Sequence, residues 1–474
     1  MANEHPILAG GRRVRTTDEM AVKNPYDGST VAVTYLAGDA EAEASTAAAA
    51  ESFAATRKMT AAERADALHR VSSQISQRAE ELARLISKEA GKPITSSRQE
   101  VQRSIFTFQY AAEEARRLHG EIIPLDAQPL GRGHVCLVRR FPIGPVLGIT
   151  PFNFPLNLVA HKVAPAMAAG NPIVVKPAPQ TPLTALLLGE IVSDSGWPAG
   201  AISVIPAPNG VAERMVADDR YKFFSFTGSA AVGWRLKKTA GRKKTALELG
   251  GNSGAVVHHD ANLPYAAERI ALGGFGYAGQ SCISVQRVFV HESVYDEFKR
   301  LFLERVATVR AGDPMDESVL VGPLISNRDA LRLGDWLKEA LGGGARLLCG
   351  GAFNGPVMEP TVLENTKPEM KVNCLEVFGP LVTLTPYADA EEALKAVNDS
   401  EFGLQAGIFT NDLGLAFRAW ETLDVGGVIV GNAPTFRMDH MPYGGTKASG
   451  QGREGLRYAM EEMTEPKSMV INLP

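Results

Sequence analysis

The chain has 474 residues, of which 45% are hydrophobic, so it can bury a large core divided into two or three domains. Its formal net charge of −4 at pH 7 provides no basic surface of the kind that nucleic acid or an anionic membrane requires. Because no apolar run has membrane-spanning length and no basic-then-apolar leader opens the sequence, we expect a cytoplasmic protein that acts on a small molecule.

The four cysteines, Cys136, Cys282, Cys349 and Cys374, are widely separated in the sequence. They form no CxxC pair and no Cys/His cluster with the spacing of metal ligands, so neither a disulfide framework nor a metal site is expected. A reducing cytosol fits this usage of cysteine.

The first 120 residues predict short extended pieces followed by two long helices. Turn dipeptides break residues 1–40. Thr60 and Glu63 then form a capping box ahead of apolar residues at helical spacing, and Gly91 and Pro93 close that helix. A second helix is predicted over residues 98–118. Together these two helices are expected to cover a sheet.

Strands and helices alternate from residue 134 onwards. Residues 134–150 predict strand, turn, strand, and the pattern then continues with strands at 172–176, 202–205 and 223–226 and helices at 181–195, 210–218 and 229–240. It restarts after Glu248 with a strand at 255–258 and a helix at 263–271. The alternation predicts an α/β protein with two doubly wound parallel-sheet domains. A lone strand at 467–473 needs a partner.

Two stretches are candidates for binding a nucleotide. Residues 226–233 follow a strand and open a helix with Ser229 as N-cap, so free N–H groups and the positive helix end would suit a pyrophosphate. Lys176 ends an apolar strand, where its ammonium would suit ribose or phosphate oxygens. The alternatives are an ordinary N-cap and a solvated loop lysine.

The sequences Glu248-Leu-Gly-Gly251 and Gly279-Gln-Ser-Cys282 combine a carboxylate with a thiol among small residues. A thiol is a useful nucleophile as thiolate, and a tight turn before a helix would aim backbone N–H groups at Cys282. Taken singly, Cys282 could equally be a buried hydrophobe and Glu248 a solvated strand-end charge.

Seven motifs in order give the chain a resemblance to the aldehyde dehydrogenase superfamily over nearly its whole length. They are Thr150-Pro-Phe-Asn-Phe-Pro155, Lys176-Pro177, Phe226-Thr-Gly-Ser229, Glu248-Leu-Gly-Gly251, Gly279-Gln-Ser-Cys282, Glu376-Val-Phe-Gly-Pro380, and Pro442-Tyr-Gly-Gly-Thr-Lys447 with the glycine-rich segment that follows.

The resemblance implies oxidation of an aldehyde with NAD or NADP. Cys282 would attack the aldehyde carbon, the Asn153 amide and the Cys282 backbone N–H would hold the oxyanion, and Glu248 would activate water to hydrolyse a thioester. No metal is implied. The residues implied in cofactor binding are Thr150, Pro151, Phe152, Lys176, Pro179, Gln180, Gly228, Ser229, Val232, Leu249, Glu376 and Phe378.

The same resemblance divides the chain into three parts. It places a cofactor-binding Rossmann-like domain at residues 1–121 and 142–248, and a catalytic domain at residues 249–455. Residues 122–141 and 456–474 would form a small β oligomerisation element. That element would join a neighbouring subunit in a homodimer or homotetramer and supply the C-terminal strand with its partner.

Departures from the family pattern bear on specificity. Pro179 stands where NAD-preferring relatives often carry a glutamate, so nothing repels a 2′-phosphate and NADP becomes admissible. Tyr443 replaces a common phenylalanine. Relatives line the tunnel mouth at positions corresponding to Arg103, Ser281, Ile283, Arg437 and His440, although both arginines could be ordinary surface charges.

The segment around Arg437 resembles lactaldehyde, phosphonoacetaldehyde and non-phosphorylating glyceraldehyde-3-phosphate dehydrogenases, which implies a small polar, hydroxylated or anionic aldehyde. Ser281 argues against a phosphorylated one, because phosphate-using relatives tend to carry arginine before the nucleophile. Two alternatives remain. The first is acyl transfer to coenzyme A, which would use the same thiol without needing Glu248. The second is a non-catalytic binding role, which predicts that Cys282, Glu248 or Asn153 is replaced, whereas all three are present.

Overall fold

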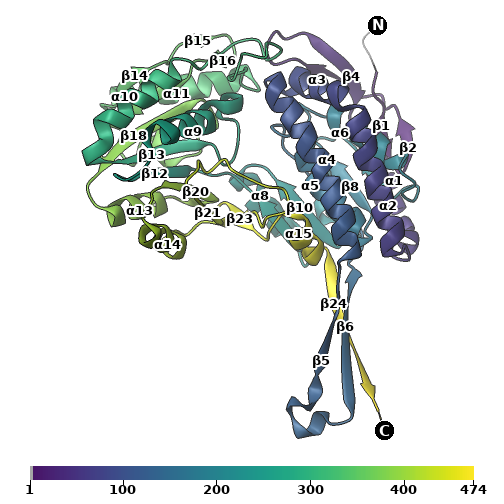
Figure 1. Cartoon of the computed structure of the whole chain (residues 1–474). Helices are drawn as coiled ribbons and strands as arrows, with labels where there is room; N and C mark the ends of the chain where they lie inside the picture. The colour runs from purple at the N-terminus through teal and green to yellow at the C-terminus, as the bar shows by residue number, and fades with distance from the viewer. Residues whose placement is uncertain (1–3, 474) are drawn as a thin grey trace.

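The computed structural model describes residues 4–473, which form two α/β bodies and a β-ribbon that projects away from them (Figure 1). The helices of the first body are α1 Asp39–Thr56, α2 Ala61–Gln77, α3 Ala79–Ala90, α4 Ile94–Arg116, α5 Asn157–Ala169, α6 Leu183–Ser193, α7 Asn209–Ala217, α8 Ala230–Thr239 and α15 Leu456–Glu462. Those of the second body are α9 Leu263–Phe275, α10 Tyr295–Val306, α11 Asn327–Gly342, α12 Lys371–Cys374, α13 Ala390–Asn398 and α14 Leu413–Thr422.

The first body is built on an eight-stranded sheet with the order β2-β1-β9-β8-β7-β10-β11-β23. Its strands are β1 Ile7–Ala9, β2 Arg12–Val14, β7 Val146–Ile149, β8 Ile173–Lys176, β9 Ile202–Val204, β10 Phe223–Thr227, β11 Lys244–Glu248 and β23 Gly450–Gln451. The five strands from β9 to β11 are parallel, and β7, the first of them in sequence, lies in the middle. This is the predicted doubly wound order, in which ligands bind where the strand order reverses.

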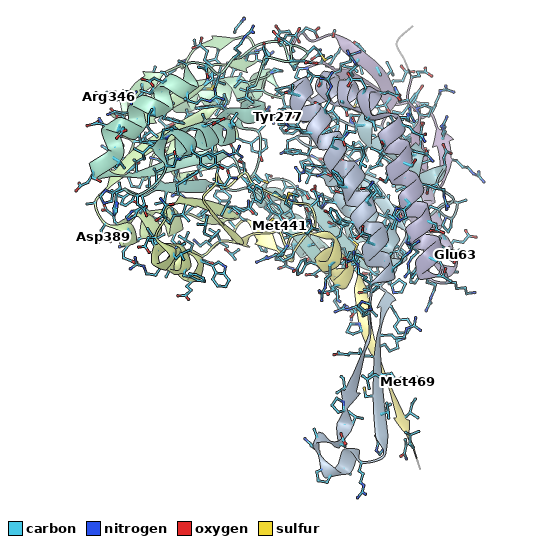
Figure 2. All side chains as sticks on the ribbon, in the orientation of Figure 1. Glu63, Tyr277, Arg346, Asp389, Met441 and Met469 are labelled. Atoms are coloured by element: carbon cyan, nitrogen blue, oxygen red, sulfur yellow. The ribbon has the colours of Figure 1, made fainter. Side chains whose placement is uncertain are left out.

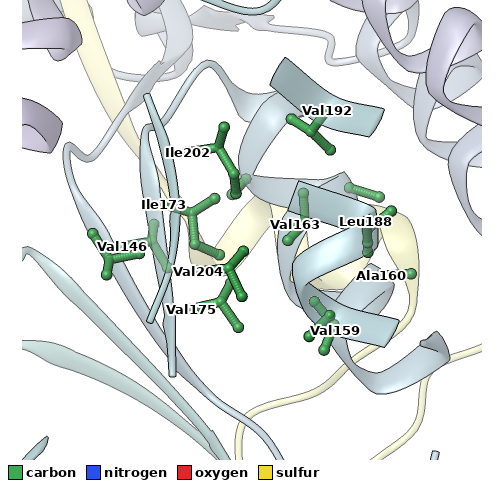
Figure 3. Packing of buried hydrophobic residues seen from close by; sticks show 14 of the residues in the cluster. Val146, Val159, Ala160, Val163, Ile173, Val175, Leu188, Val192, Ile202 and Val204 are labelled. Carbon is green, nitrogen blue, oxygen red and sulfur yellow. The ribbon is translucent and has the colours of Figure 1, made fainter. Parts of the chain in front are cut away.

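The core of the first body explains why one of its helices escapes prediction. Figure 3 shows Val146, Ile173 and Val175 of the sheet packed against Val159 and Val163 of α5. All thirteen residues of α5 are buried, so the helix has no solvent-exposed polar face whose 3.6-residue period would mark it in the sequence. Each buried valine or isoleucine contributes about 1.5–3 kcal/mol to stability.

The helical layer predicted between residues 60 and 118 is present with different breaks. The Thr60–Glu63 capping box is confirmed, because the Thr60 N–H donates to Glu63 at 2.7 Å and the Glu63 N–H donates to the Thr60 hydroxyl at 3.2 Å. The helix is divided at Arg78 into α2 and α3, since the backbone of Arg78 leaves helical geometry. Gly91 ends α3 in the left-handed region at φ 65°, as its position before Pro93 predicts.

The second body is built on a seven-stranded sheet with the order β14-β17-β18-β13-β12-β20-β21. Its strands are β12 Ser253–Val257, β13 Val285–His291, β14 Arg346–Cys349, β17 Thr361–Glu364, β18 Leu381–Tyr387, β20 Gln405–Phe409 and β21 Gly427–Val430. All are parallel except β14, at one edge. Short two-stranded pairs complete the fold, namely β3 Glu19–Lys23 with β4 Thr30–Tyr35, β15 Phe353–Asn354 with β16 Val357–Met358, and β19 Phe402–Gly403 with β22 Thr446–Lys447.

The ribbon corrects one expectation about the C-terminal strand. Strand β24 (Thr464–Asn472) pairs along its whole length with β6 (His134–Pro142), and β5 (Glu121–Pro124) pairs with the other side of β6. The partner of the C-terminal strand is therefore in its own chain, whereas a neighbouring subunit was expected. The ribbon still exposes apolar side chains, among them Met469 in Figure 2.

Helix α15 lies outside the ribbon although residues 456–474 were expected to belong to it. Leu456 and Met460 of α15 are buried in the core of the first body. Among the described residues, no helix is both long and apolar enough to cross a membrane.

Candidate active site

The chain passes between the two sheets at the predicted Glu-Leu-Gly-Gly motif. Strand β11 of the first sheet ends at Glu248, and strand β12 of the second sheet begins at Ser253. Cys282 lies just before β13, so the amino end of the second sheet faces the carboxyl end of the first. The expectation of a helix after Cys282 is wrong, because a strand follows. The thiol therefore has no helix N-terminus to lower its pKa.

The two glycines after Glu248 let three motifs meet. A Cβ atom on Gly251 would lie 2.2 Å from the carbonyl oxygen of Cys282, and one on Gly250 would lie 2.3 Å from a carboxylate oxygen of Glu376. The Gly251 N–H donates to that carboxylate at 3.0 Å. Any larger residue at either position would force the Cys282 or Glu376 segment away.

A strained turn aims Cys282. Tyr277, Ala278 and Gly279 have φ values of 53°, 54° and 65°, so three successive residues are left-handed, and two of them are not glycine. The side chain of Gln280 holds this turn in place, since its amide donates to Pro323 at 3.1 Å and accepts from the Ile325 N–H at 2.9 Å. Backbone strain of this kind persists only where the surroundings enforce it, and it clusters at functional sites.

Asn153, Glu248 and Cys282 line one cavity of about 400 Å³. The Asn153 amide nitrogen donates one N–H to the Gln280 carbonyl at 3.0 Å, and its amide oxygen is buried with no hydrogen bond. An amide nitrogen carries two hydrogens, so the second N–H of Asn153 can serve an oxyanion. The three predicted catalytic residues are thus brought together from segments far apart in the chain.

Cys282 carries a neutral thiol in this environment. Burial raises the pKa of the thiol to about 12, and the carboxyls of Glu376 and Glu248 also raise it. The hydroxyl of Tyr443, 3.0 Å from the sulfur, and the guanidinium of Arg437 act in the opposite direction. The burial contribution is the larger, so the thiolate must be generated during the reaction.

Glu248 is poised to hold a proton. Both of its carboxylate oxygens are buried without a hydrogen bond from any described residue. Burial, and next the negative charge of Glu454, raise the pKa of Glu248 well above its usual value, although Arg437 and Lys162 oppose them. Glu454 is itself held ionised, because Arg437 contacts it at 3.0 Å and Lys162 at 3.5 Å.

A second cavity of about 240 Å³ runs from the first along the carboxyl ends of β7, β8 and β10. The two cavities share Pro151, Phe152, Thr227, Gly228 and Ser229. Every residue predicted to bind the cofactor lines one or both of them. Thr150, Pro151, Phe152, Lys176, Pro179, Gln180, Gly228, Ser229 and Val232 line the second cavity, while Leu249, Glu376 and Phe378 line the first.

Several unpaired groups make this groove suitable for a dinucleotide. The Thr150 hydroxyl is buried without a hydrogen bond, and Ser229 caps α8 without using its side chain, which leaves the first N–H groups of the helix for an anion. Burial lowers the pKa of Lys176 to about 8, a cost that an anionic ligand would offset. Phe152 and Phe378 meet edge to face at 5.8 Å beside the first cavity. The residues present therefore fit NAD(P).

Sequence reasoning missed other residues that line the groove. Arg235 and Glu213 form an ion pair at its wall, and Arg332 and Trp336 of α11 line the first cavity. Arg235 lies one helical turn beyond Val232, so the i, i+3 spacing on the helix that opens at Ser229 could have identified it.

The predicted substrate residues are not among those that line the two cavities. Arg103 pairs with Asp439 at 2.7 Å, and Arg437 lies 3.7 Å from the centre of the Tyr443 ring while pairing with Glu454. None of the five lines either cavity. Ile283 packs on Tyr443 in a small apolar cluster. His440 is exposed, and its ring lies 4.9 Å from that of Tyr110. Ser281 is half-buried. Both arginines thus have internal carboxylate partners.

Asp439 connects Arg103 to the buried helix α5. It accepts from Asn157 at 3.1 Å and contacts His161 at 2.8 Å, in addition to the Arg103 pair. Despite burial, His161 and Arg103 hold the pKa of this carboxyl well below its usual range. The segment that precedes Pro442 is therefore held by charge as well as by packing.

The chain is similar to known proteins over nearly its whole length. A model of the aldehyde dehydrogenase family matches residues 13–469. The 3-sulfolactaldehyde dehydrogenase of Priestia megaterium is 41% identical over 99% of this chain and 98% of its own length. The lactaldehyde dehydrogenase of Methanococcus aeolicus is 38% identical over 96% of this chain and 97% of its own.

Two solved structures are similar in fold as well as in sequence. Aldehyde dehydrogenase 21 of Physcomitrella patens, in complex with the reaction product succinate, is 43% identical, has a TM-score of 0.98, and is matched over 100% of this chain and 99% of its own. The glyceraldehyde-3-phosphate dehydrogenase GapN of Methanocaldococcus jannaschii, complexed with NADP, is 37% identical, has a TM-score of 0.93, and is matched over 96% of this chain and 100% of its own.

Proposed function

The chain belongs to the aldehyde dehydrogenase family and is an oxidoreductase that acts on aldehydes with NAD or NADP, and we propose that its substrate is a short aldehyde bearing a hydroxyl or an acidic group. The product would be the corresponding carboxylic acid. One observation carries this proposal, namely that Cys282, Glu248 and Asn153 line a single cavity continuous with a groove suited to a dinucleotide.

In the first half of the reaction, the Cys282 sulfur, after losing its proton, forms a bond to the aldehyde carbon. The carbonyl oxygen becomes an oxyanion, which the free N–H of Asn153 stabilises. A donor of this kind contributes about 3–4 kcal/mol to lowering the barrier. Bound NAD(P)⁺ supplies the hydride acceptor. Once the carbon has lost hydride, the C=O bond reforms and a thioester remains on Cys282.

In the second half, Glu248 takes a proton from water, and the resulting hydroxide adds to the thioester carbon. The C–S bond then breaks, which releases the carboxylic acid and returns the sulfur of Cys282. Glu248 suits this role because its oxygens have no hydrogen-bond partner among the described residues, so both lone-pair sets are free for water. Its raised pKa also makes it a stronger base once it is ionised.

The substrate class is supported by the similar proteins and by the positive charge close to Cys282. The relatives' names give sulfolactaldehyde, lactaldehyde and sulfoacetaldehyde, and the moss structure carries the dicarboxylate succinate. In this chain Tyr443 contacts both Cys282 and Arg437. Its hydroxyl lies 3.0 Å from the Cys282 sulfur, and the centre of its ring lies 3.7 Å from the Arg437 guanidinium. We propose that Arg437 and Arg103, together with Ser281, Ile283 and His440, orient the polar end of the aldehyde.

We also propose that the β-ribbon joins subunits into a homodimer or homotetramer in the cytoplasm. Ile122, Leu130, Val470 and Leu473 of the ribbon are exposed apolar residues, and both outer strands, β5 and β24, have an unpaired edge within the described chain. Light scattering of the purified protein measures the assembly mass. A monomer at micromolar concentration would contradict the proposal.

The deciding experiment is the absorbance of reduced nicotinamide with a panel of aldehydes, with NAD⁺ or NADP⁺, and with or without coenzyme A. We expect turnover without coenzyme A. We also expect Cys282→Ala to abolish turnover while cofactor binding persists, because the groove lies on other elements. Cys374→Ala is the matched control. Loss of activity in Cys374→Ala with retention in Cys282→Ala would overturn the assignment, and strict dependence on coenzyme A would favour acyl transfer.

A further inference from the structure

Three histidines gather at the carboxyl edge of the second sheet, outside the cavities described above. His258 directly follows β12, His291 ends β13, and Tyr387 ends β18. The strand registers pair Val257 with Val290 and His291 with Tyr387, so these three side chains occupy one row across neighbouring parallel strands. His259 follows in the chain. The strands themselves therefore place the imidazoles together.

The rings are close enough to share a ligand. The His258 ring lies 4.2 Å from that of His259 and 5.3 Å from that of His291, and the last two are 5.2 Å apart. One nitrogen each from His258 and His259 and a carboxylate oxygen of Asp260 all lie within 4.8 Å of one another. Small shifts of the half-buried His258 ring and the exposed His259 ring would bring such donors to the Zn–N distance of about 2.0–2.1 Å.

One ring nitrogen of His258 has a hydrogen-bond partner. The Tyr387 hydroxyl lies 2.8 Å from Nδ1 of His258 and 3.4 Å from the Val257 carbonyl, to which it can donate. In the tautomer in which Nδ1–H donates to the Tyr387 oxygen, Nε2 of His258 has a free lone pair. Metal-binding histidines usually have such a partner on the other ring nitrogen.

The Asp260 carboxylate is also held in place. Asp260 accepts from the Thr410 hydroxyl at 3.0 Å and from the Asn411 N–H at 2.9 Å, and these bonds fix the direction of its carboxylate. His291 is a neighbour of the site and not one of its donors, because its Nδ1 accepts from the Ser293 backbone N–H at 3.3 Å and the neutral ring therefore carries its proton on Nε2.

We propose that His258, His259 and Asp260 bind one divalent transition-metal ion. Two imidazoles with one carboxylate suit Zn²⁺, Ni²⁺ or Cu²⁺, whereas Mg²⁺ and Ca²⁺ prefer oxygen ligands. Sequence spacing did not indicate the site, because the consecutive residues His258, His259 and Asp260 match none of the common spacings of metal ligands.

The ion would stabilise the second body without taking part in aldehyde oxidation. The seven residues of β13 separate the cluster from Cys282, and at about 3.3 Å per residue this is roughly 20 Å. Asp260 already connects the end of β12 to the segment before α14 through Thr410 and Asn411. A bound metal would therefore strengthen the connection between the end of β12 and the segment before α14, and would raise the melting temperature of the protein.

The test uses the full chain without an affinity tag, treated with chelator and then dialysed. Cys282→Ala serves as the parent so that the active-site thiol cannot bind metal. Calorimetric titration with Zn²⁺ is expected to show one saturable equivalent, and Co²⁺ is expected to give visible d–d absorption. Adding His259→Ala should weaken Zn²⁺ binding by more than about tenfold. His69→Ala, an exposed histidine on α2, is the matched control and should bind as the parent does.

His259 is exposed, so its replacement is not expected to disturb folding. A second measurement checks this, because His259→Ala in the chain that retains Cys282 should keep full aldehyde oxidation. The proposal is overturned if the parent shows no saturable binding, or if His259→Ala and His69→Ala bind Zn²⁺ equally well. Since neither result depends on turnover, the metal site and the proposed substrate class can fail separately.

Discussion

The hydroxyl of Tyr443 lies 3.0 Å from the sulfur of Cys282, and the guanidinium of Arg437 lies 3.7 Å from the centre of the same tyrosine ring. Burial keeps Cys282 protonated, so a donor at this distance favours the thiolate. Tyr443 cannot serve as the base, because burial and the neighbouring thiol raise the pKa of its own hydroxyl well above the usual value. The positive charge behind the ring strengthens the hydroxyl as a donor.

We therefore expect Tyr443→Phe to make Cys282 less reactive. A lost hydrogen bond to a charged group is worth about 1.5–3 kcal/mol, which would raise the apparent pKa of the thiol by about one unit or more. The measurement is the rate of alkylation by iodoacetamide as a function of pH. Tyr26→Phe, at the protein surface, is the matched control. An unchanged pH profile in Tyr443→Phe would mean that the contact does not stabilise the thiolate.

Glu248→Gln is expected to block hydrolysis of the thioester more than hydride transfer, because an amide cannot accept the proton from water. Rapid mixing should show a burst of reduced cofactor followed by very slow turnover. In the unmodified enzyme, the raised pKa of Glu248 means that its basic form grows as pH rises, so the hydrolysis rate should increase with pH. That increase should vanish in Glu248→Gln. Equal loss of burst and steady-state rate would instead make Glu248 the activator of Cys282.

The same pKa shift has a consequence for stability. A carboxyl whose pKa is raised by folding stabilises the protein below its unfolded pKa, and this contribution is lost as pH rises through the folded value. Glu248→Gln removes the cost of ionising this buried group. As pH rises from the ordinary carboxyl pKa of 4.5 through the raised pKa of Glu248, the variant should therefore lose less stability than the parent, as measured by thermal unfolding. Glu248 is thus held in a destabilising environment that its proposed role requires.

Some elements of the fold could be predicted from local sequence patterns, and others could not. The capping box at Thr60 and the strand–helix alternation after residue 134 are local signals, and both are confirmed. Helix α5 gave no signal because a helix buried on every side has no solvent-exposed polar face to mark its period in the sequence. The strand after Cys282 was mistaken for a helix because small residues in a turn fit either continuation.

In the active site, too, the residues with a local motif could be predicted from the sequence, whereas contacts between distant residues could not. All predicted catalytic and cofactor residues line the two cavities, since each carries a motif of its own. The contact between Cys282 and Tyr443 joins residues 161 positions apart, and the pairing of Arg437 with Glu454 depends on how a loop folds back. Such distances are fixed by tertiary packing, which no spacing rule in the sequence contains.

Cofactor preference gives a further prediction. Pro179 lines the nucleotide groove together with Lys176 and Arg235, so the wall near it carries positive charge, and Glu213 is the only acidic residue among the lining residues of this cavity. Pro179→Glu should weaken NADP far more than NAD, because a carboxylate repels the 2′-phosphate and can bind the ribose hydroxyls. The readout is KM for each cofactor, with Pro179→Gln as the uncharged control. An unchanged ratio would place the ribose elsewhere.

The last prediction concerns the two arginines proposed to orient the substrate. Arg437→Ala is a poor test, because it would leave Glu454 buried beside Glu248 with one cation fewer, and breaking such a pair costs about 3–5 kcal/mol. Arg437→Lys keeps the charge but loses the planar pair of donors that matches a carboxylate or sulfonate. Arg103→Gln is the second variant, since the Arg103 side chain is 30% exposed.

If these residues orient an acidic substrate, both variants should raise KM for the anionic aldehyde, by about tenfold for one lost charged hydrogen bond. KM for a neutral aldehyde of the same length should barely change, because the thiol, Asn153 and Glu248 are untouched. Alkylation of Cys282 by iodoacetamide separates this effect from a change in the thiol, since it should proceed in Arg103→Gln as in the parent. A long-chain or aromatic aldehyde with the highest kcat/KM, and no response to either variant, would rule out the acidic substrate.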